Sequence, residues 1–190
     1  MLGLFGKLVL ATPTGVTTSY NCISDVVIHA HLFGIKRVSF YDPFAIICNN
    51  ASAIRELINT SFKKRELKGR VSFVGDKLID TAGVIYVHLI GPDHGVGGLV
   101  KACKALCHCE KRITPAQISE YLTCNESVFE PDLLLRIGAH QAQRFFLAGY
   151  PPFSLRVTEI VDVQNCFFAN VNEFFCVLQQ FAARDRRLGR

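Results

Sequence analysis

The sequence contains no apolar run long enough to cross a membrane and no secretory signal. A membrane-spanning helix needs about 20 apolar residues, whereas the opening stretch MLGLFGKLVLATPTG ends in turn residues and the later apolar stretches are interrupted by Lys, Arg, Asp or Pro. We therefore expect a cytosolic domain without a membrane segment of its own. Its eight cysteines are expected to be reduced thiols, because disulfide frameworks belong to short secreted chains.

Charged residues are also few. They make up 19% of the 190 residues while hydrophobic residues make up 49%, a balance that excludes intrinsic disorder and suits one domain covering residues 1–190. The net charge of +5 is modest, and the basic residues gather at 63–65 and in the C-terminal stretch RDRRLGR. A nucleic-acid-binding protein would more often carry one concentrated basic face. Local binding of an anion is the better interpretation.

Sequence signatures of catalysis are missing too. The chain has no G-x-S-x-G, H-E-x-x-H or C-x-x-C. A Mg²⁺ site in a diphosphate enzyme needs converging carboxylates, but the acidic residues near strand ends occur singly. They are Asp42, Asp76, Asp80, Asp93 and Glu159. The loop in IGPDHGVGGLV fits neither the dinucleotide fingerprint nor the phosphate loop, and CKALCHCE lacks a second pair of zinc ligands. We predict no catalytic residue and no metal site in this chain.

Strand-like and helix-like segments alternate, which predicts an α/β fold with a mostly parallel sheet. The expected strands are 7–12, 36–42, 70–76, 84–92, 131–138 and 154–163. The expected helices are 19–34, 49–69, 97–109, 114–123 and 170–187. The second helix should be capped by Asn49 or Asn50 and end at Gly69, and the fourth should be capped by Thr114. The last helix should bury one stripe, formed by Val171, Phe174, Phe175, Leu178, Phe181 and Ala182.

The C-terminal stretch RDRRLGR has two interpretations. Arginines at 184, 186 and 187 suit a solvated helix end, where cations meet the negative pole of the helix dipole. That view does not explain Gly189 followed by a terminal Arg190. A glycine lets the backbone approach an anion closely, and arginine forks bind phosphate oxygens in pairs. A clamp that reaches a site on a neighbouring chain is therefore an equal alternative.

Three segments of the chain, EPDLLLRIG, PPFSLRVTEIV and FFCVLQQFAARDRRLGR, resemble the C-terminal half of the cis-prenyltransferase family. The segments GIKRVSFYDPFAIICNNASAIRELI and RVSFVGDK agree in order, so the resemblance runs from about Lys7 to Arg190. It is greatest to the accessory subunits of the Nogo-B receptor type. The resemblance implies an undecaprenyl diphosphate synthase-like sheet flanked by helices, and a dimer in which a terminal Arg-x-Gly motif binds substrate diphosphate on the partner. That motif falls on Arg187, Leu188 and Gly189.

Two departures from the family pattern imply that this subunit is not catalytic. Catalytic members carry Asp-Gly-Asn-Gly-Arg-Trp after the first strand, where this chain has ATPTGVTTSY. They also carry Arg-Thr-Ser-Gly-Glu, where RIGAHQAQRFFLAGY keeps only Arg136; Arg144 has no certain counterpart. Glu159 stands where catalytic members have a glutamate linked to the metal site. Arg136 and Glu159 are therefore weaker substrate-binding candidates than the tail.

The resemblance thus implies an accessory subunit of a heteromeric dehydrodolichyl diphosphate synthase, in dolichol biosynthesis for protein glycosylation. Its catalytic partner would bind Mg²⁺ and elongate farnesyl diphosphate with isopentenyl diphosphate. We expect the complex at the cytosolic face of the endoplasmic reticulum, held through the partner or an additional N-terminal segment. The dimer interface is expected to include LLLRIG and SLRVTEI. The alternatives are a divergent but active single-chain cis-prenyltransferase and a non-enzymatic, receptor-like interaction domain on the same fold.

Overall fold

The computed structural model describes residues 7–11, 20–74, 76, 83–108, 112–125, 129–137, 147, 149–155, 157–163 and 170–184. Its six strands form one sheet in the order β3-β4-β2-β1-β5-β6, and every pair of neighbouring strands is parallel. The strands are β1 (Lys7–Ala11), β2 (Arg37–Tyr41), β3 (Arg70–Phe73), β4 (Val84–Ile90), β5 (Leu133–Ile137) and β6 (Glu159–Val163). The predicted α/β class with a mostly parallel sheet is confirmed.

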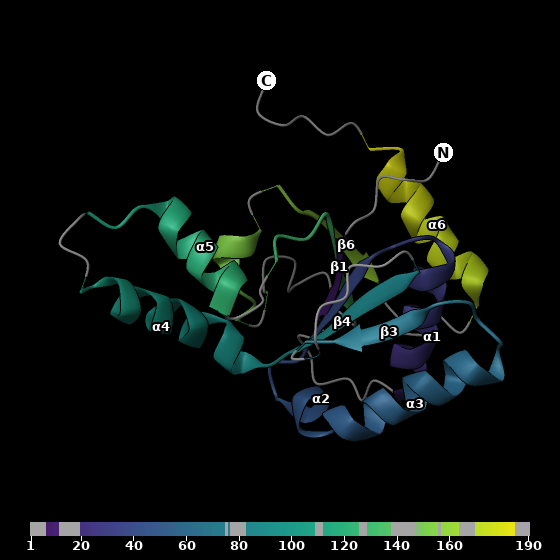
Figure 1. The fold of residues 1–190 in the computed structure, drawn as a ribbon. Helices are drawn as coiled ribbons and strands as arrows, with labels where there is room; N and C mark the ends of the chain where they lie inside the picture. The colour runs from purple at the N-terminus through teal and green to yellow at the C-terminus, as the bar shows by residue number, and fades with distance from the viewer. Residues whose placement is uncertain are drawn as a thin grey trace.

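Helices lie on both sides of this sheet (Figure 1). They are α1 (Tyr20–Leu32), α2 (Ile46–Asn49), α3 (Ala51–Lys64), α4 (Val96–Leu106), α5 (Pro115–Asn125) and α6 (Val171–Ala182), with 3-10 turns η1 (Pro92–His94) and η3 (Pro152–Ser154). One side is covered by α1, α3 and α6, whose buried residues form the main hydrophobic core with residues from β2, β4 and β5. No helix in the described residues combines the length and the apolar character that crossing a bilayer requires.

The two faces of the sheet differ in composition because successive residues of a strand point to opposite sides. We call the side packed on α1, α3 and α6 the helix-covered face; on β2 and β4 it presents Val38, Phe40, Ile85 and Val87, all buried. The other side, which we call the mixed face, carries polar and aromatic side chains at the alternate positions. Those residues are Arg37, Ser39, Tyr41, Tyr86, His88 and Arg136, and the apolar Ile90 and Leu134 lie on the same face.

Helices α4 and α5 pack against one another and extend away from the sheet, and we call them the α4–α5 arm (Figure 1). The arm buries few side chains: Ala102 on α4 and Leu122 on α5 are buried, whereas Val96 is 60% exposed. Thr114 caps α5 as expected, because its Oγ1 accepts from the Gln117 amide at 3.3 Å while Gln117 Oε1 accepts from the Thr114 amide at 2.9 Å. This reciprocal pair is a capping box.

The helix expected at 49–69 begins earlier and ends earlier than predicted. It is split into α2 and α3 at Asn50, whose side chain donates to the Ile46 carbonyl at 2.8 Å instead of capping α3. It ends at Lys64, and Glu66, two residues further on, is the first residue with a left-handed backbone angle (φ 51°), before Gly69 (φ 140°). Gly69 is needed for another reason: a Cβ there would collide with the Gly83 carbonyl and the His31 ring.

Two further boundaries also differ. The last strand begins at Glu159, and Ser154 lies in η3 instead of in the strand. The last helix buries Phe174, Leu178 and Phe181, as its stripe predicts, but Val171 and Ala182 at its ends are exposed. Asn170 caps α6 by accepting a hydrogen bond from the Asn172 amide at 2.9 Å. Residues 185–190 lie outside the described residues.

Candidate functional site

The carboxyl ends of the parallel strands meet at one edge of the sheet, which is where ligands bind in open α/β folds. The chain passes from β1 to β2 on one side, while β5 pairs with β1 on the other. The switch point of the topology therefore lies at β1. Ala11 at the end of β1 is the register partner of Arg136 on β5. The stretch ATPTGVTTSY begins here, but residues 12–19 lie outside the described part.

Arg136 is fixed at this switch point by an acidic neighbour. Its side chain is 1% exposed, and its Nε and Nη2 donate to the two carboxylate oxygens of Asp162 at 2.6 and 2.8 Å. The two residues are register partners on β5 and β6, so the sheet itself positions the bidentate pair. Asp162, which sequence analysis did not single out, thus balances the charge of Arg136. Its signal lay in the alternation of EIVDV, which becomes readable only once the strand register is known.

The single acidic residues at strand ends organise turns. Asp42 follows β2, is 3% exposed, and accepts from the amides of Phe44 and Ile47 at 2.9 and 3.0 Å. Asp76 follows β3, accepts from the Phe73 amide at 2.8 Å and pairs with Arg55 at 3.0 Å. The Phe73 amide, and then Arg55, lower the pKa of Asp76.

Metal ligands do not gather in the part of the chain that the structure describes: nowhere there do three His, Cys, Asp or Glu side chains group around a point that could hold a metal ion. The carboxylates of Asp42 and Asp76 are already engaged by backbone amides. Within these residues the carboxyl edge offers a fixed arginine but no metal cradle.

An aromatic cluster closes the carboxyl ends of β2 and β4. The rings of Tyr41 and Tyr150 meet edge to face with centroids 5.3 Å apart, beside Ile90 and Leu134. Burial raises the pKa of Tyr41 to about 12 and raises that of Tyr150 as well. Both phenols therefore stay neutral at physiological pH.

The backbone on this side is closely packed, and its nearby thiol is unreactive. A Cβ on Gly95 would collide with the carbonyl oxygen of Gly149, so the loop after β4 lies directly against the segment before η3. Burial, with help from Asp42 and Asp93, raises the pKa of the Cys48 thiol. A raised pKa leaves little thiolate, so Cys48 is not an activated nucleophile.

Glu159 lies at the amino ends of the strands, opposite the carboxyl edge that holds Arg136. It begins β6, in register with Leu133, and its Oε2 accepts from Arg184 Nη1 at 2.8 Å. Three strand positions separate it from Asp162, a distance of about 10 Å along the strand. The structure therefore does not bring Glu159 and Arg136 together within one chain. Arg184, which was expected only to cap a helix end, ties the end of α6 to the start of β6.

The Arg187, Leu188 and Gly189 motif lies outside the described residues, and so does Arg144. What the structure describes is the point from which the tail departs. Arg184 is anchored on Glu159, at the amino edge of β6. The tail therefore starts on the side of the sheet opposite to this chain's own switch point.

The chain matches no protein-family model. It is 27% identical over 188 residues to the dehydrodolichyl diphosphate synthase complex subunit NUS1 of Homo sapiens, covering 90% of this chain and 62% of that protein. It is 25% identical over 187 residues to the corresponding subunit of Mus musculus, covering 90% of this chain and 61% of that one. The chain thus spans about three fifths of the length of these curated relatives.

Two solved structures share the fold. A probable undecaprenyl diphosphate synthase from Campylobacter jejuni superposes with a TM-score of 0.61 at 14% identity, covering 98% of this chain and 99% of that one. Lavandulyl diphosphate synthase from Lavandula x intermedia, in complex with dimethylallyl diphosphate, gives 0.64 at 18% identity, with 98% of each chain covered. The resemblance to cis-prenyltransferases, and to the accessory subunit in particular, is confirmed.

Proposed function

We propose that the chain is the non-catalytic accessory subunit of a heteromeric dehydrodolichyl diphosphate synthase, in dolichol biosynthesis for protein glycosylation. The observation that carries the proposal is its similarity, across 90% of its length, to two subunits of that complex. The carboxyl edge supports a non-catalytic role. In the described residues, its acids Asp42 and Asp76 hold backbone turns and no three metal-ligand side chains converge.

The terminal motif of Arg187, Leu188 and Gly189 is proposed to bind the diphosphate of a substrate on the catalytic partner. Two features support an action on the partner instead of on this chain. The tail leaves α6 beside Glu159, opposite the carboxyl edge of its own sheet. Arginine forks bind phosphate oxygens in pairs, and a preorganised positive charge stabilises the departing diphosphate. Arg136 is a weaker candidate because Asp162 already occupies its fork.

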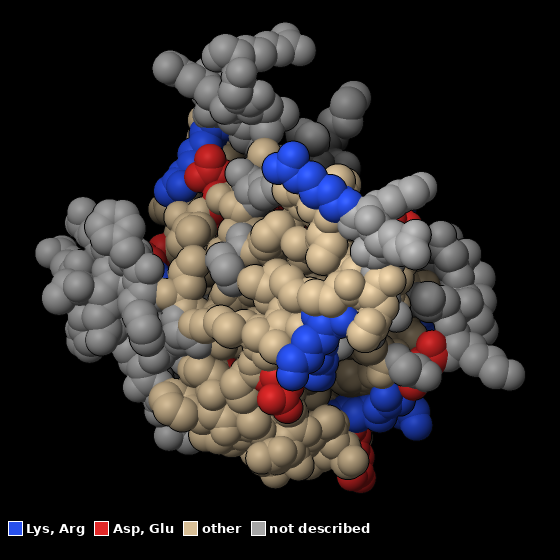
Figure 2. Space-filling model, turned by 90° about the vertical axis from the view of Figure 1, so that its left-hand side faces the viewer, with Lys and Arg blue, Asp and Glu red and all other residues tan. Residues whose placement is uncertain are grey.

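The catalytic partner is proposed to bind along the α4–α5 arm and β6. Exposed apolar side chains are Val96 (60%) and Val100 (46%) on α4, Ile160 (38%) on β6 and Val157 (55%) just before β6. Figure 2, which looks at the molecule from the side to which the arm extends, shows few charged side chains among many uncharged ones. A large uncharged, partly apolar surface favours a protein partner. Of the two segments expected at the interface, LLLRI is buried within the sheet, whereas SLRVTEI contributes the exposed Val157 and Ile160.

The partner is proposed to supply Mg²⁺ and the elongation chemistry, and to place the complex at the cytosolic face of the endoplasmic reticulum. The test is reconstitution with a catalytic cis-prenyltransferase subunit, farnesyl and isopentenyl diphosphates and Mg²⁺. The chain alone should make no polyprenyl product, and the pair should make far more than the partner alone. Robust elongation by the pure chain would favour the active single-chain alternative. If the chain does not change the activity of the catalytic subunit, the result would favour the receptor-like alternative.

The clamp itself is tested by substitutions in the reconstituted complex. Arg187→Ala should lower kcat/KM at least about tenfold, because it removes a charge-assisted contact to phosphate. Gly189→Ala should also lower it, since the added methyl obstructs close backbone approach. Arg184→Ala is the matched control: its partner is Glu159, so the activity should stay near that of the wild type. Equal and small effects at all three positions, with unchanged thermal melts, would reduce the tail to a solvated helix end.

A further inference from the structure

Four residues at the centre of the mixed face form a polar patch within the sheet. Arg37 is the register partner of Tyr86, and Ser39 is the register partner of His88. Ser39 and His88 are only 6% and 5% exposed. At the alternate positions of the same strands the helix-covered face is entirely apolar. Polar groups in the middle of a buried parallel strand reduce the stability of the fold compared with apolar ones. Positions that break the apolar pattern in this way are expected at functional sites, so this polar patch is a candidate binding surface.

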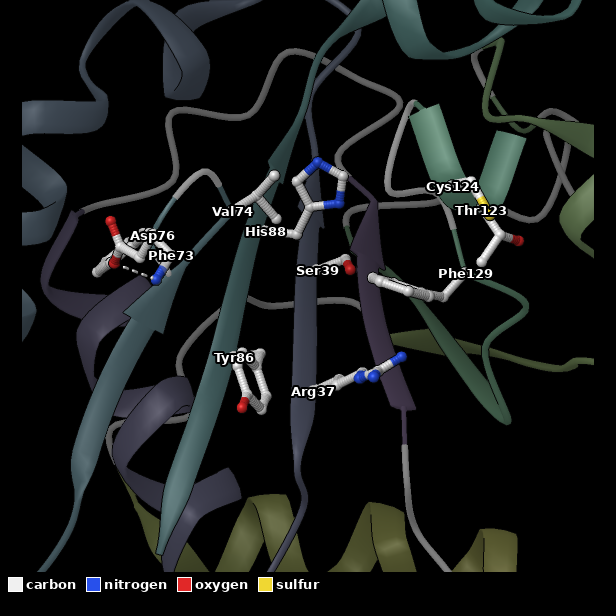
Figure 3. Close-up of a pocket in the computed structure, with 10 residues that line it drawn as sticks. All are labelled: Arg37, Ser39, Phe73, Val74, Asp76, Tyr86, His88, Thr123, Cys124 and Phe129. Carbon is white, nitrogen blue, oxygen red and sulfur yellow. Dashed lines mark hydrogen bonds between the residues drawn. The ribbon is translucent and has the colours of Figure 1, made fainter. Parts of the chain in front are cut away.

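A cavity of about 280 Å³ lies over this patch. Phe73 and Val74 line it at the end of β3, and Thr123, Cys124 and Phe129 line it on the side of α5. In Figure 3 the His88 ring and the Ser39 hydroxyl lie between these two walls, with Arg37 and Tyr86 further along the same strands. Cavities that collect a few polar groups within mostly apolar walls are typical of small-molecule sites.

Arg37 supplies the positive charge of the cavity. Its guanidinium lies over the Phe129 ring, 4.3 Å from the centroid, and 5.9 Å from that of Tyr86. The acid that lines the cavity, Asp76, is bound by Arg55 at 3.0 Å and by the Phe73 amide at 2.8 Å. Among the described residues, the structure therefore records aromatic rings and no carboxylate beside the Arg37 guanidinium. When a guanidinium lies over an aromatic ring, its N–H groups point outward in the plane of the guanidinium, where they can still donate to an anion.

We propose that this cavity binds a small organic anion with a flat apolar body. The anionic group pairs with Arg37, the body lies between the wall at Val74 and the wall at Phe129, and Ser39 and His88 offer hydrogen bonds from the floor. The volume is at the small end of the range for ligand pockets, which fits a body of about two fused rings. The site contains neither Arg136 nor the terminal motif, so it is independent of the proposed role in prenyl transfer.

The experiment uses 2-naphthoate as the probe. Naphthalene-2-methanol, which has the same ring system without the negative charge, is the control ligand. The sequence has no tryptophan, so naphthyl fluorescence can be titrated against the full chain without that background. We expect saturable binding of the acid, at least about tenfold tighter than of the alcohol, because only the acid gains a charge-assisted contact. Titration of ¹³C-labelled protein should shift the His88 ring signals saturably, a readout that needs no variant.

Variants then assign the binding to this cavity. Arg37→Gln should reduce the affinity for naphthoate to that for the alcohol, and Arg37→Lys should retain part of the preference. Arg70→Gln, at an exposed arginine that begins β3 and does not line the cavity, is the matched control and should change nothing. Ser39→Leu should block both probes by filling the cavity, with thermal melts confirming the fold. Equal binding of acid and alcohol, an unmoved His88 signal, or no saturable binding below about 5 mM would overturn the proposal.

Discussion

The two faces of the sheet serve different ends. The helix-covered face is filled by apolar side chains from β2 and β4 that pack against α1, α3 and α6. The mixed face carries Arg37, Ser39, His88 and Arg136 at the alternate positions of the same sheet. Strands buried on both sides usually read as continuous apolar runs. The contrast indicates that the helix-covered face supplies most of the hydrophobic stabilisation.

The topology accounts for this division. Right-handed crossovers from β1 to β2 and from β2 to β3 place α1 and α3 on the same side. The return from β4 to β5 runs in the other direction and carries the α4–α5 arm over the opposite side. Because the arm extends away from the sheet, the mixed face is covered less completely.

The largest expected effect lies on the helix-covered face. Phe174→Ala should destabilise the chain by about 3–5 kcal/mol, because it empties a fully buried ring site beside His29 and Phe33. Urea unfolding followed by circular dichroism measures the loss. Phe175→Ala, one position along and half-buried, is the control and should cost clearly less. Equal losses at both positions would mean that the face is not packed as described.

An intermediate effect is expected at the ion pair of the mixed face. Asp162→Ala should cost about 1–3 kcal/mol, since it leaves the buried guanidinium of Arg136 without its carboxylate. The loss stays below that for a deep pair because Asp162 is 43% exposed and water can enter. Glu159→Ala, which breaks the more exposed pair with Arg184, should cost at most about 1 kcal/mol. A double change, Arg136→Met with Asp162→Val, should recover stability; if it does not, Arg136 has a further buried role.

The smallest expected effect is a pH dependence on α1. Burial lowers the pKa of His29 from 6.5, with Asp25 opposing and Arg65 adding to the shift. The unfolded chain then binds the proton first, so His29 contributes stability that is present above pH 6.5 and is lost as the pH falls below it. His29→Gln should flatten the dependence of the unfolding free energy on pH between about 5 and 7.

The fold was largely predictable because its strands are short apolar runs separated by turn residues. All six strands were expected, and errors occurred where local signals compete. Gly69 was expected to end the helix, but the helix ends at Lys64, just before Glu66, which has a left-handed backbone angle. The residue that adopts this angle depends on the tertiary packing as well as on residue preference. Asn50 suited a cap, but its amide instead bonds the preceding turn at Ile46. Such alternatives are decided by packing and not by residue preference.

The candidate site was harder to predict from the sequence than the fold. Arg136 was expected from a motif, but its partner Asp162 lies 26 residues further on and is identified only by the register of β5 and β6. His88 lies beside Ser39 because β4 pairs directly with β2 in the sheet, although β3 comes between them in the sequence. The tail motif at 187–189 stays a prediction, since the described residues end at Arg184.

The position of β1 in the sheet has a consequence for how the chain is made. β1 is central, yet one of its edges is completed only by β5, where Leu8 pairs with Leu133. At a synthesis rate of about 5–20 residues per second, the ribosome needs roughly 6–25 s to make the residues between them. During that interval one edge of β1 has no strand partner. An unpaired strand edge attracts other chains, so a chaperone that covers this edge should raise the yield of folded protein.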